Sequence, residues 1–183
     1  MQVHKTPIPG MCIVTSTAHR DERGAFTRLF CRDTLRHIMD DRQILQINYS
    51  TTNSLGAVRG LHFQTSPHAE MKLVRCLRGK VWDVVVDLRS DSPTFLQWHA
   101  ETLDAESLKM IVIPEGCAHG FQALAVDSEL IYLHTALYRP DHEGGLRYDD
   151  PALKIAWPLP PTDISIRDRS HPPIDPSFPG VNL

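Results

Sequence analysis

The regular interruption of short apolar runs by proline and glycine is the feature that most constrains how this chain can fold. Its 183 residues include 14 prolines and 10 glycines, and the runs between them are rich in valine, isoleucine, leucine and aromatic residues. Segments this short suit strands joined by turns and leave little room for the helices of βαβ units. We therefore predict an all-β sandwich or barrel with few short helices.

The clearest strands in the sequence are residues 72–77 and 81–88. Only Arg78-Gly79-Lys80 lies between them, and a short connection that contains glycine predicts a β-hairpin. Because side chains alternate along a strand, Asp83 and Asp87 would share one face of the second strand with two valines. We expect this face to line a polar cavity.

Other segments fit the same all-β pattern. Further strands are expected over residues 43–50, 109–113 and 130–138, with turns at Ser92-Pro93, 114–116 and Arg139-Pro140. One short helix is expected over residues 33–39, capped by Asp33 or Thr34. The tail, residues 157–183, is predicted to be rich in loop, with a turn near 163–168. The length suits a single domain over residues 1–183.

Composition disfavours several classes of function. Basic residues number 19 and acidic residues 22, which gives a net charge of −3, so neither a disordered chain nor a nucleic-acid partner is expected. No apolar run approaches the roughly 20 residues that span a bilayer, and the first residues lack the apolar stretch of a signal peptide. We predict a cytoplasmic protein with a small-molecule substrate and no membrane partner.

The spacing of cysteines and histidines argues against a metal centre. The four cysteines lack Cys-x-x-Cys spacing and are expected to be free thiols. Most single histidines are structural, but His62 and His119 each lie at a glycine-marked end of an apolar strand. Metal-binding β-barrels usually offer His-x-His followed closely by Glu, whereas Phe63 and Gln64 follow His62 and the next histidine is His68. We predict no metal and no cofactor.

A series of ordered motifs gives a more specific indication. They are AspGluArgGly (21–24), GlnIleAsn (46–48), ArgGlyLeuHisPheGln (59–64), LysLeuValArg (72–75), ValAspLeuArg (86–89), SerProThrPhe (92–95), IleProGluGlyCysAlaHisGlyPhe (113–121), AspAspPro (149–151) and SerIleArgAsp (165–168). In this order they resemble the dTDP-4-dehydrorhamnose 3,5-epimerase family, nucleotide-sugar epimerases of the cupin superfamily. A chance match of so many motifs in one order is remote.

The resemblance implies a cupin-type jelly roll that forms a homodimer, with N-terminal strands that can be exchanged between subunits. The substrate would be a nucleoside-diphosphate 4-keto-6-deoxy sugar, inverted at C3 and usually also at C5, in deoxysugar or surface polysaccharide biosynthesis. Removing a proton beside the 4-ketone gives an enolate. Such a site needs a base, a donor for the developing oxyanion and an acid across the sugar ring.

The family motifs assign catalytic roles to four residues. His62 would be the base, and Asp168 would fix its tautomer and stabilise the imidazolium. Lys72 would bind the enolate oxygen. Tyr132 would be the acid, because a phenol with a reference pKa of about 10 carries a proton at neutral pH.

Further substrate contacts are also implied by the resemblance. Arginine forks match phosphate oxygens, so Arg23, Arg59 and Arg167 would clamp the diphosphate. Asp83 and His119 would orient the catalytic groups or the sugar. The other predicted binding residues, for the nucleotide and the sugar, are Phe26, Arg28, Gln46, Asn48 and Tyr138.

One departure from the family pattern bears on the nucleotide. The family usually carries glutamate where this chain has Arg28, on the side of the pocket near the thymine. A carboxylate can accept a hydrogen bond from thymine N3–H, whereas arginine has only donors. Cytosine and guanine present acceptors, so we predict a different base, with CDP preferred. Departures at His19, Leu133 and Leu137 leave the sugar open.

Two alternative functions stay open. A related cupin could epimerise C3 alone or act as a keto-isomerase, and product stereochemistry would separate these activities. A non-catalytic cupin that binds sugar nucleotides would lack the acid or the base, yet His62, Lys72, Tyr132 and Asp168 are all present. A metal-free epimerase is therefore the leading prediction.

Overall fold

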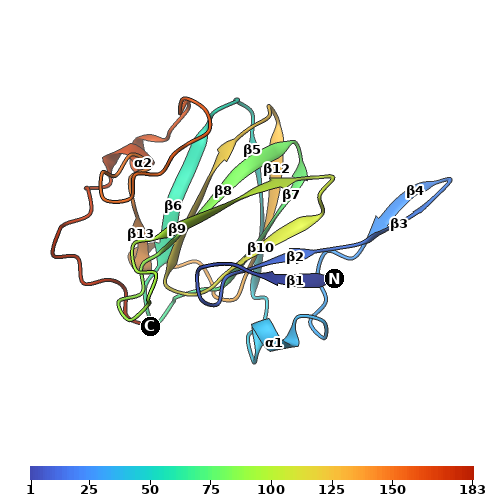
Figure 1. The fold of residues 1–183 in the computed structure, drawn as a ribbon, viewed down its shortest axis with the longest axis horizontal. Coiled ribbons are helices and arrows are strands. Elements are labelled where there is room, and N and C mark those ends of the chain that lie inside the picture. Colours follow the sequence, from blue (N-terminus) through green and yellow to red (C-terminus); the bar gives the residue numbers. More distant parts are fainter.

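Two antiparallel β-sheets face each other in the computed structural model, which describes residues 1–183 (Figure 1). The first sheet has the strand order β1-β2-β10-β7-β12-β5 and the second β13-β6-β11-β8-β9. The first comprises β1 (Gln2–Lys5), β2 (Cys12–Thr15), β5 (Gln46–Thr52), β7 (Lys72–Arg78), β10 (Lys109–Ile113) and β12 (Ser128–His134). The second comprises β6 (Val58–Gln64), β8 (Lys80–Asp87), β9 (Trp98–Asp104), β11 (Cys117–Ala123) and β13 (Glu143–Gly145). The other elements are β3 (Ala18–Asp21), β4 (Gly24–Thr27), α1 (Arg36–Met39), the 3-10 helix η1 (Pro140–His142) and α2 (Ile166–Ser170).

Apolar side chains pack between the sheets and on both outer faces. Val74 of the first sheet and Val85 of the second belong to the cluster between the sheets. Met39 of α1 packs with buried residues of β2, β7 and β10. The C-terminal segment covers the outer face of the second sheet, where Val181 packs with Val84 and Val86. The predicted all-β, cupin-like fold with few short helices is confirmed.

The predicted hairpin between residues 72–77 and 81–88 is wrong. Both segments are strands, but β7 pairs with β10 and β12, whereas β8 pairs with β9 and β11. Gly79, at a φ of +74°, turns the chain from one sheet to the other, and an added Cβ there would lie 2.6 Å from Oγ of Ser128. A short glycine connection is therefore compatible with a change of sheet, which the local sequence does not distinguish from a hairpin.

The predicted alternation along β8 is correct, but the prediction that the face with Asp83 and Asp87 lines a polar cavity is wrong. Val81 and Val85 face the core between the sheets, and Val84 and Val86 face the C-terminal segment. Neither aspartate lines one of the main pockets. Asp83 is fully buried against His119, and Asp87 lies at the end of the strand, where its carboxylate pairs with Arg89 at 2.8 Å.

Several predicted boundaries differ from the structure. β10 covers the predicted residues, whereas β5 and β12 begin and end at other positions than expected. α1 begins later than predicted, after Leu35, and neither Asp33 nor Thr34 caps it. In the tail, the predicted turn is the short helix α2, in which Ser165 accepts a hydrogen bond from the Asp168 N–H.

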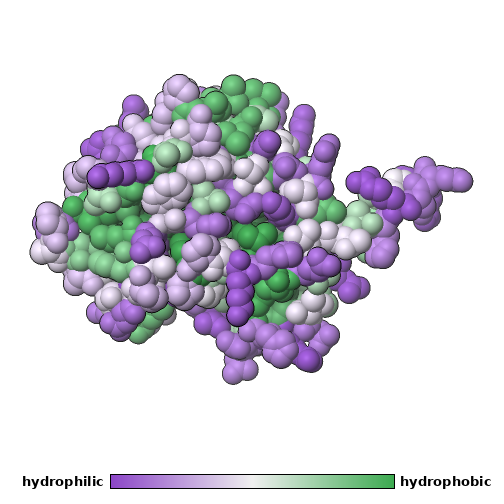
Figure 2. Space-filling model, in the orientation of Figure 1, coloured by the Kyte–Doolittle hydropathy of each residue, from purple (hydrophilic) through white to green (hydrophobic).

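The β3–β4 hairpin projects away from the two sheets (Figure 1). Figure 2 shows that this projection is mainly hydrophilic on the visible face. Phe26 on this hairpin is nevertheless 72% exposed. All four cysteines are free thiols, as predicted. None of the helices is long and apolar enough to cross a membrane.

Candidate active site

A pocket of about 550 Å³ opens between the two sheets. One wall is built from β5 and β12 of the first sheet, and the facing wall from β6 and β11 of the second. The residues that line it are Ile47, Asn48, Tyr49, Ser50, Arg59, His62, Glu70, Lys72, His119, Gly120, Phe121, Tyr132, His134, Tyr138, Glu143 and Arg167. The fold therefore gathers most of the predicted site residues around one cavity.

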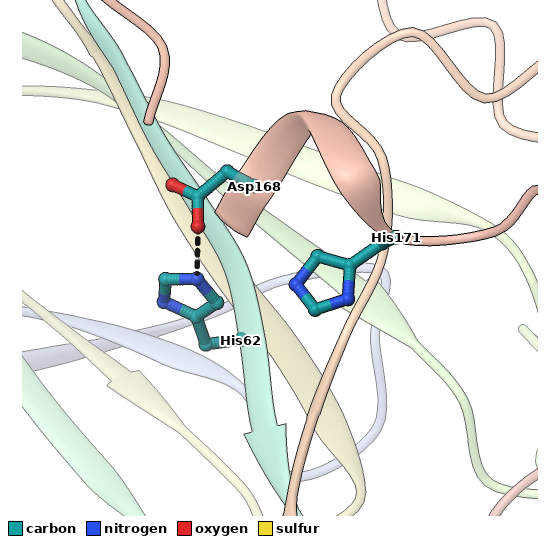
Figure 3. A group of neighbouring side chains, drawn as sticks. All are labelled: His62, Asp168 and His171. Atoms are coloured by element: carbon teal, nitrogen blue, oxygen red, sulfur yellow. Dashed lines mark hydrogen bonds and ion pairs between the residues drawn. The ribbon is translucent and has the colours of Figure 1, made fainter. Parts of the chain in front are cut away.

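His62 and Asp168 form a hydrogen-bonded pair at this pocket (Figure 3). His62 lies on β6 and Asp168 on α2, and His62 Nε2 is 2.9 Å from Asp168 Oδ1. The other carboxylate oxygen accepts the Gly60 N–H at 3.2 Å. Burial opposes ionisation of Asp168, but the bonds from His62 and Gly60, with that of Ser165, outweigh it and hold the pKa of this carboxyl well below its usual range. The carboxylate is therefore ionised and fixed from two sides.

The neighbours of His62 decide which ring nitrogen carries the proton. Nε2 also lies 3.0 Å from Nη2 of Arg167, but one nitrogen cannot both donate to Asp168 and accept from Arg167. The bond to the charged carboxylate is the stronger of the two because its acceptor is ionised, so we assign the proton to Nε2. The lone pair is then on Nδ1, which points away from Asp168 (Figure 3).

A second histidine–carboxylate pair lies beside the first. His119 on β11 is opposite His62 on β6 in the register of the two strands. Its Nε2 lies 3.0 and 2.9 Å from the two carboxylate oxygens of Asp83, which is fully buried. Burial raises the pKa of Asp83, and the charge and hydrogen bond of His119 act against that rise. Asp83 thus holds the His119 ring in place without reaching the pocket itself.

Tyr132 faces these two histidines from the other sheet. Its ring centroid lies 6.2 Å from that of His119, and its hydroxyl lies 3.1 Å from Oγ of Ser50. Burial raises the pKa of Tyr132 to about 12, against the effect of the Ser50 hydrogen bond. The phenol therefore keeps its proton at neutral pH, on the wall opposite His62.

Lys72 belongs to a buried charged cluster. Its Nζ lies 3.2 Å from Oε1 of Glu70 and 3.3 Å from the His62 carbonyl oxygen. The other Glu70 oxygen lies 2.8 Å from Nδ1 of His134. Burial opposes ionisation of Glu70, but His134 and Lys72 outweigh it and lower the pKa of this carboxyl. One carboxylate thus holds both the lysine and the histidine at the pocket wall.

Sequence reasoning missed Glu70, His134 and Glu143. His134 could have been found, because it lies two residues after Tyr132 on the same strand and so on the same face. Glu70 precedes a strand, and Glu143 lies on the three-residue β13. No periodicity marks either position.

Polar residues at the open side of the pocket form a connected group. The Tyr138 hydroxyl donates to Glu143 Oε2 at 2.9 Å, and Arg167 Nη1 lies 3.0 Å from the same oxygen. Gln46 lies just outside the lining residues, where it donates to Asn48 Oδ1 at 3.1 Å. A second pocket of about 540 Å³ shares Arg59, His62 and Arg167 with the first. The two arginines therefore stand between two adjoining cavities.

Three of the predicted binding residues lie on or next to the projecting β3–β4 hairpin and do not line this pocket. Arg23 and Phe26 lie on the projecting β3–β4 hairpin, and Arg28 follows it. The Arg23 guanidinium pairs instead with Asp21 at 2.6 Å. None of the three lines the pocket of its own subunit, and the hairpin projects away from the sheets (Figure 1).

Comparison with known proteins adds independent evidence. The family model described as dTDP-4-dehydrorhamnose 3,5-epimerase matches residues 5–175. The chain belongs to this family. Among members of the epimerase family, the dTDP-4-dehydrorhamnose 3,5-epimerase of Salmonella typhimurium strain LT2 is 40% identical over 179 residues, which cover 96% of each protein. The predicted family and the predicted enzyme class, an isomerase, are confirmed.

Solved structures of the epimerase family share the fold. The dTDP-4-dehydrorhamnose 3,5-epimerase of Bacillus anthracis, with TDP and PPi bound, matches with a TM-score of 0.91 at 34% identity, covering 94% of this chain and 99% of that one. A 3'-monoepimerase from Streptomyces bikiniensis, in complex with dTDP-quinovose, matches with a TM-score of 0.86 at 33% identity, covering 93% and 86%. The family thus includes both double and single epimerases.

Proposed function

We propose that this enzyme inverts C3 and C5 of a dTDP-linked 4-keto-6-deoxy hexose through enolate intermediates. The observation that carries the proposal is the placement of two opposed proton-transfer groups. The His62–Asp168 pair lies on one wall of the pocket, and the protonated Tyr132 lies on the facing wall. Inversion needs such an arrangement, because the proton leaves one face of the carbon and returns to the other.

The reaction uses each group once per inversion. Nδ1 of His62 accepts the proton from the carbon beside the ketone, and the electron pair of the C–H bond becomes the enolate. Asp168 stabilises the resulting imidazolium. The Lys72 ammonium stabilises the negative charge on the former ketone oxygen. Tyr132 donates its proton to the opposite face of the carbon, and solvent then restores the protonation states of Tyr132 and His62.

The adjoining cavities support a binding mode for the nucleotide. Arg59 and Arg167 line both pockets, and guanidinium groups bind phosphate oxygens with two parallel hydrogen bonds. The diphosphate is proposed to lie between them, with the sugar near His62 and Tyr132. Asn48, Gln46 and Tyr138 are then close enough to contribute further polar contacts.

A homodimer would complete this binding site. The exposed Phe26 and the neighbouring Arg23 and Arg28 do not line the pocket of their own subunit, and a projecting hairpin can be shared between two copies of a chain. The hairpin is proposed to contribute these residues to the partner's pocket. The enzyme is proposed to be cytoplasmic and to act in surface polysaccharide synthesis. Light scattering should give twice the chain mass, and Phe26→Ala should raise KM for the nucleotide sugar.

The nucleotide base needs its own test. The names of the relatives favour dTDP, whereas the predicted CDP preference depends on Arg28 alone. Competition binding of dTDP, CDP and GDP to the purified enzyme separates these alternatives. A clear preference for dTDP supports the proposal, and a CDP preference that is lost in Arg28→Glu supports the sequence-based prediction.

Deuterium exchange tests the reaction itself. The enzyme is incubated in D2O with dTDP- or CDP-4-keto-6-deoxyglucose, and deuterium at C3 and C5 is followed by NMR, with His62→Ala as control. Exchange at both carbons that is lost in His62→Ala is expected. Exchange at C3 alone would make the enzyme a single epimerase, as the Streptomyces bikiniensis relative is named. No exchange with either nucleotide would contradict the proposal.

A further inference from the structure

His171 carries a buried ring nitrogen that the proposed reaction does not use. The residue follows α2 directly, and its Nε2 is buried without a hydrogen-bond partner. Its ring centroid lies 6.4 Å from that of His62, at an interplanar angle of 67°. Figure 3 shows a ring nitrogen of His171 facing the His62–Asp168 pair. Buried polar atoms are usually satisfied, so this nitrogen points to a missing partner.

Gly145 places the His171 ring beside His62. In the register of β13 and β6, Gly145 is directly opposite His62. A Cβ at Gly145 would collide with His171 Nε2, so the ring occupies the space that a side chain would otherwise fill. The absence of a side chain at Gly145 therefore lets the His171 ring approach His62.

The three side chains form a set of donors that suits a transition metal ion. His62, Asp168 and His171 each offer one ligand atom, and these atoms all lie within 4.8 Å of one another. Two imidazoles and one carboxylate are donors that zinc accepts at about 2.0–2.2 Å, with a fourth position left for water. Ligands at such distances in a tetrahedron are about 3.4 Å apart, so a modest inward movement of His171, on an irregular segment, completes the site.

Arg167 opposes a cation at this position and is able to leave it. Its guanidinium lies 3.0 Å from His62 Nε2 and 3.5 Å from Asp168 Oδ1. The side chain is 54% exposed and already contacts Glu143 at 3.0 Å. It can therefore keep that second contact while its charge moves away from a bound ion. Moving the Arg167 charge costs free energy, and this cost lowers the affinity of the site for the metal ion.

We propose that His62, Asp168 and His171 form an inhibitory binding site for zinc or a similar divalent transition metal ion. The ion takes the Nε2 position that otherwise carries the proton of His62. The neutral ring then holds its proton on Nδ1, the nitrogen that would accept the proton of the sugar. Occupation of the site therefore removes the base without blocking the pocket. The inhibition rests on the proposed function, whereas the binding does not.

Binding is measured first, on the chelator-treated enzyme without substrate. Zinc is titrated by calorimetry, and cobalt by the visible absorption bands that report its coordination. We expect one ion per chain, and binding weakened roughly tenfold or more in His171→Asn and in His171→Gln. His142→Asn is the matched control, because it removes the other close histidine pair, His68 and His142, whose ring centroids lie 4.5 Å apart. Thermal melting verifies that each variant folds.

The outcomes separate the two parts of the proposal. Unchanged binding in His171→Asn, binding lost in His142→Asn instead, or no binding below about 100 μM zinc would overturn the site. In the exchange assay, zinc should inhibit the wild type reversibly at its binding concentration, and His171→Asn should require roughly tenfold more. Binding without inhibition would overturn the inhibitory role. If the enzyme is inactive on every nucleotide sugar, the proposed function is contradicted. The metal site is then still tested by the binding titration, which needs no activity.

Discussion

His62 Nε2 and Asp168 Oδ1 lie 2.9 Å apart, although 106 residues separate them in the sequence. The contact depends on α2, which Ser165 caps and which is held against β6 by the bond from the Gly60 N–H to Asp168. The orientation of the proposed base is therefore set by the C-terminal segment as well as by the strand that carries it.

Asp168→Asn should lower kcat roughly 1,000- to 10,000-fold, the size of effect that loss of an orienting carboxylate has on a catalytic histidine. An amide neither fixes the Nε2–H tautomer nor stabilises the imidazolium. KM should change little, because Asp168 does not line the main pocket. Steady-state kinetics gives both constants, and thermal melting controls for folding. A variant with near-normal kcat would exclude this role of Asp168.

More of the candidate site than of the strand topology could be predicted from the sequence. Motifs identified His62, Lys72, Tyr132 and Asp168 because the chemistry requires those residue types, and all four meet at or beside one pocket. The pairing of the strands was harder to predict than these residues. The link at Gly79 has the composition of a hairpin, yet it joins two sheets, because pairing is decided by distant strands such as β10 and β11.

Residues that act through a neighbour were also hard to predict. Glu70 has no signal in the sequence until the fold sets it between Lys72 and His134. Arg23, Phe26 and Arg28 were predicted to bind substrate, but a single chain leaves them on the projecting hairpin. The role proposed for them depends on a second subunit, which the pattern of one sequence cannot position.

Tyr132→Phe should separate proton removal from inversion. His62 and Asp168 remain in place, so deuterium should still exchange at C3, since the base can return a solvent deuteron to the same face. Formation of the inverted product should slow by about 100-fold or more, because the acid on the facing wall is missing. NMR in D2O measures both. Tyr148→Phe, outside the pocket, is the control, and unchanged inversion in Tyr132→Phe would mean that another group supplies the proton.

Glu70→Gln should reduce kcat about 10- to 100-fold with little change in KM, because the Lys72 ammonium loses the carboxylate that positions it. His134→Asn is the matched variant. It removes the other partner of Glu70 but leaves the ion pair with Lys72, so its effect on kcat should be smaller. Steady-state kinetics of both variants makes the comparison. A rise in KM at unchanged kcat would show that Glu70 serves binding and not the enolate.

Asp87 should make the fold sensitive to acid. Burial opposes ionisation of its side chain, but hydrogen bonds from Arg89, Ser92 and Thr94 outweigh this and lower its pKa to about 2. Because the folded pKa lies below the unfolded value of about 3.9, the stabilisation is complete above that value and is lost as the pH falls towards 2, a total of roughly 2 kcal/mol.

Asp87→Asn should therefore lower the free energy of unfolding near neutral pH and flatten its dependence on pH between about 4 and 2. Asp41→Asn, at an exposed aspartate, is the control and should follow the wild type. Urea unfolding at a series of pH values measures each curve. Parallel curves for the wild type and Asp87→Asn across this pH range would mean that the Asp87 carboxylate does not cause the pH dependence of the free energy of unfolding.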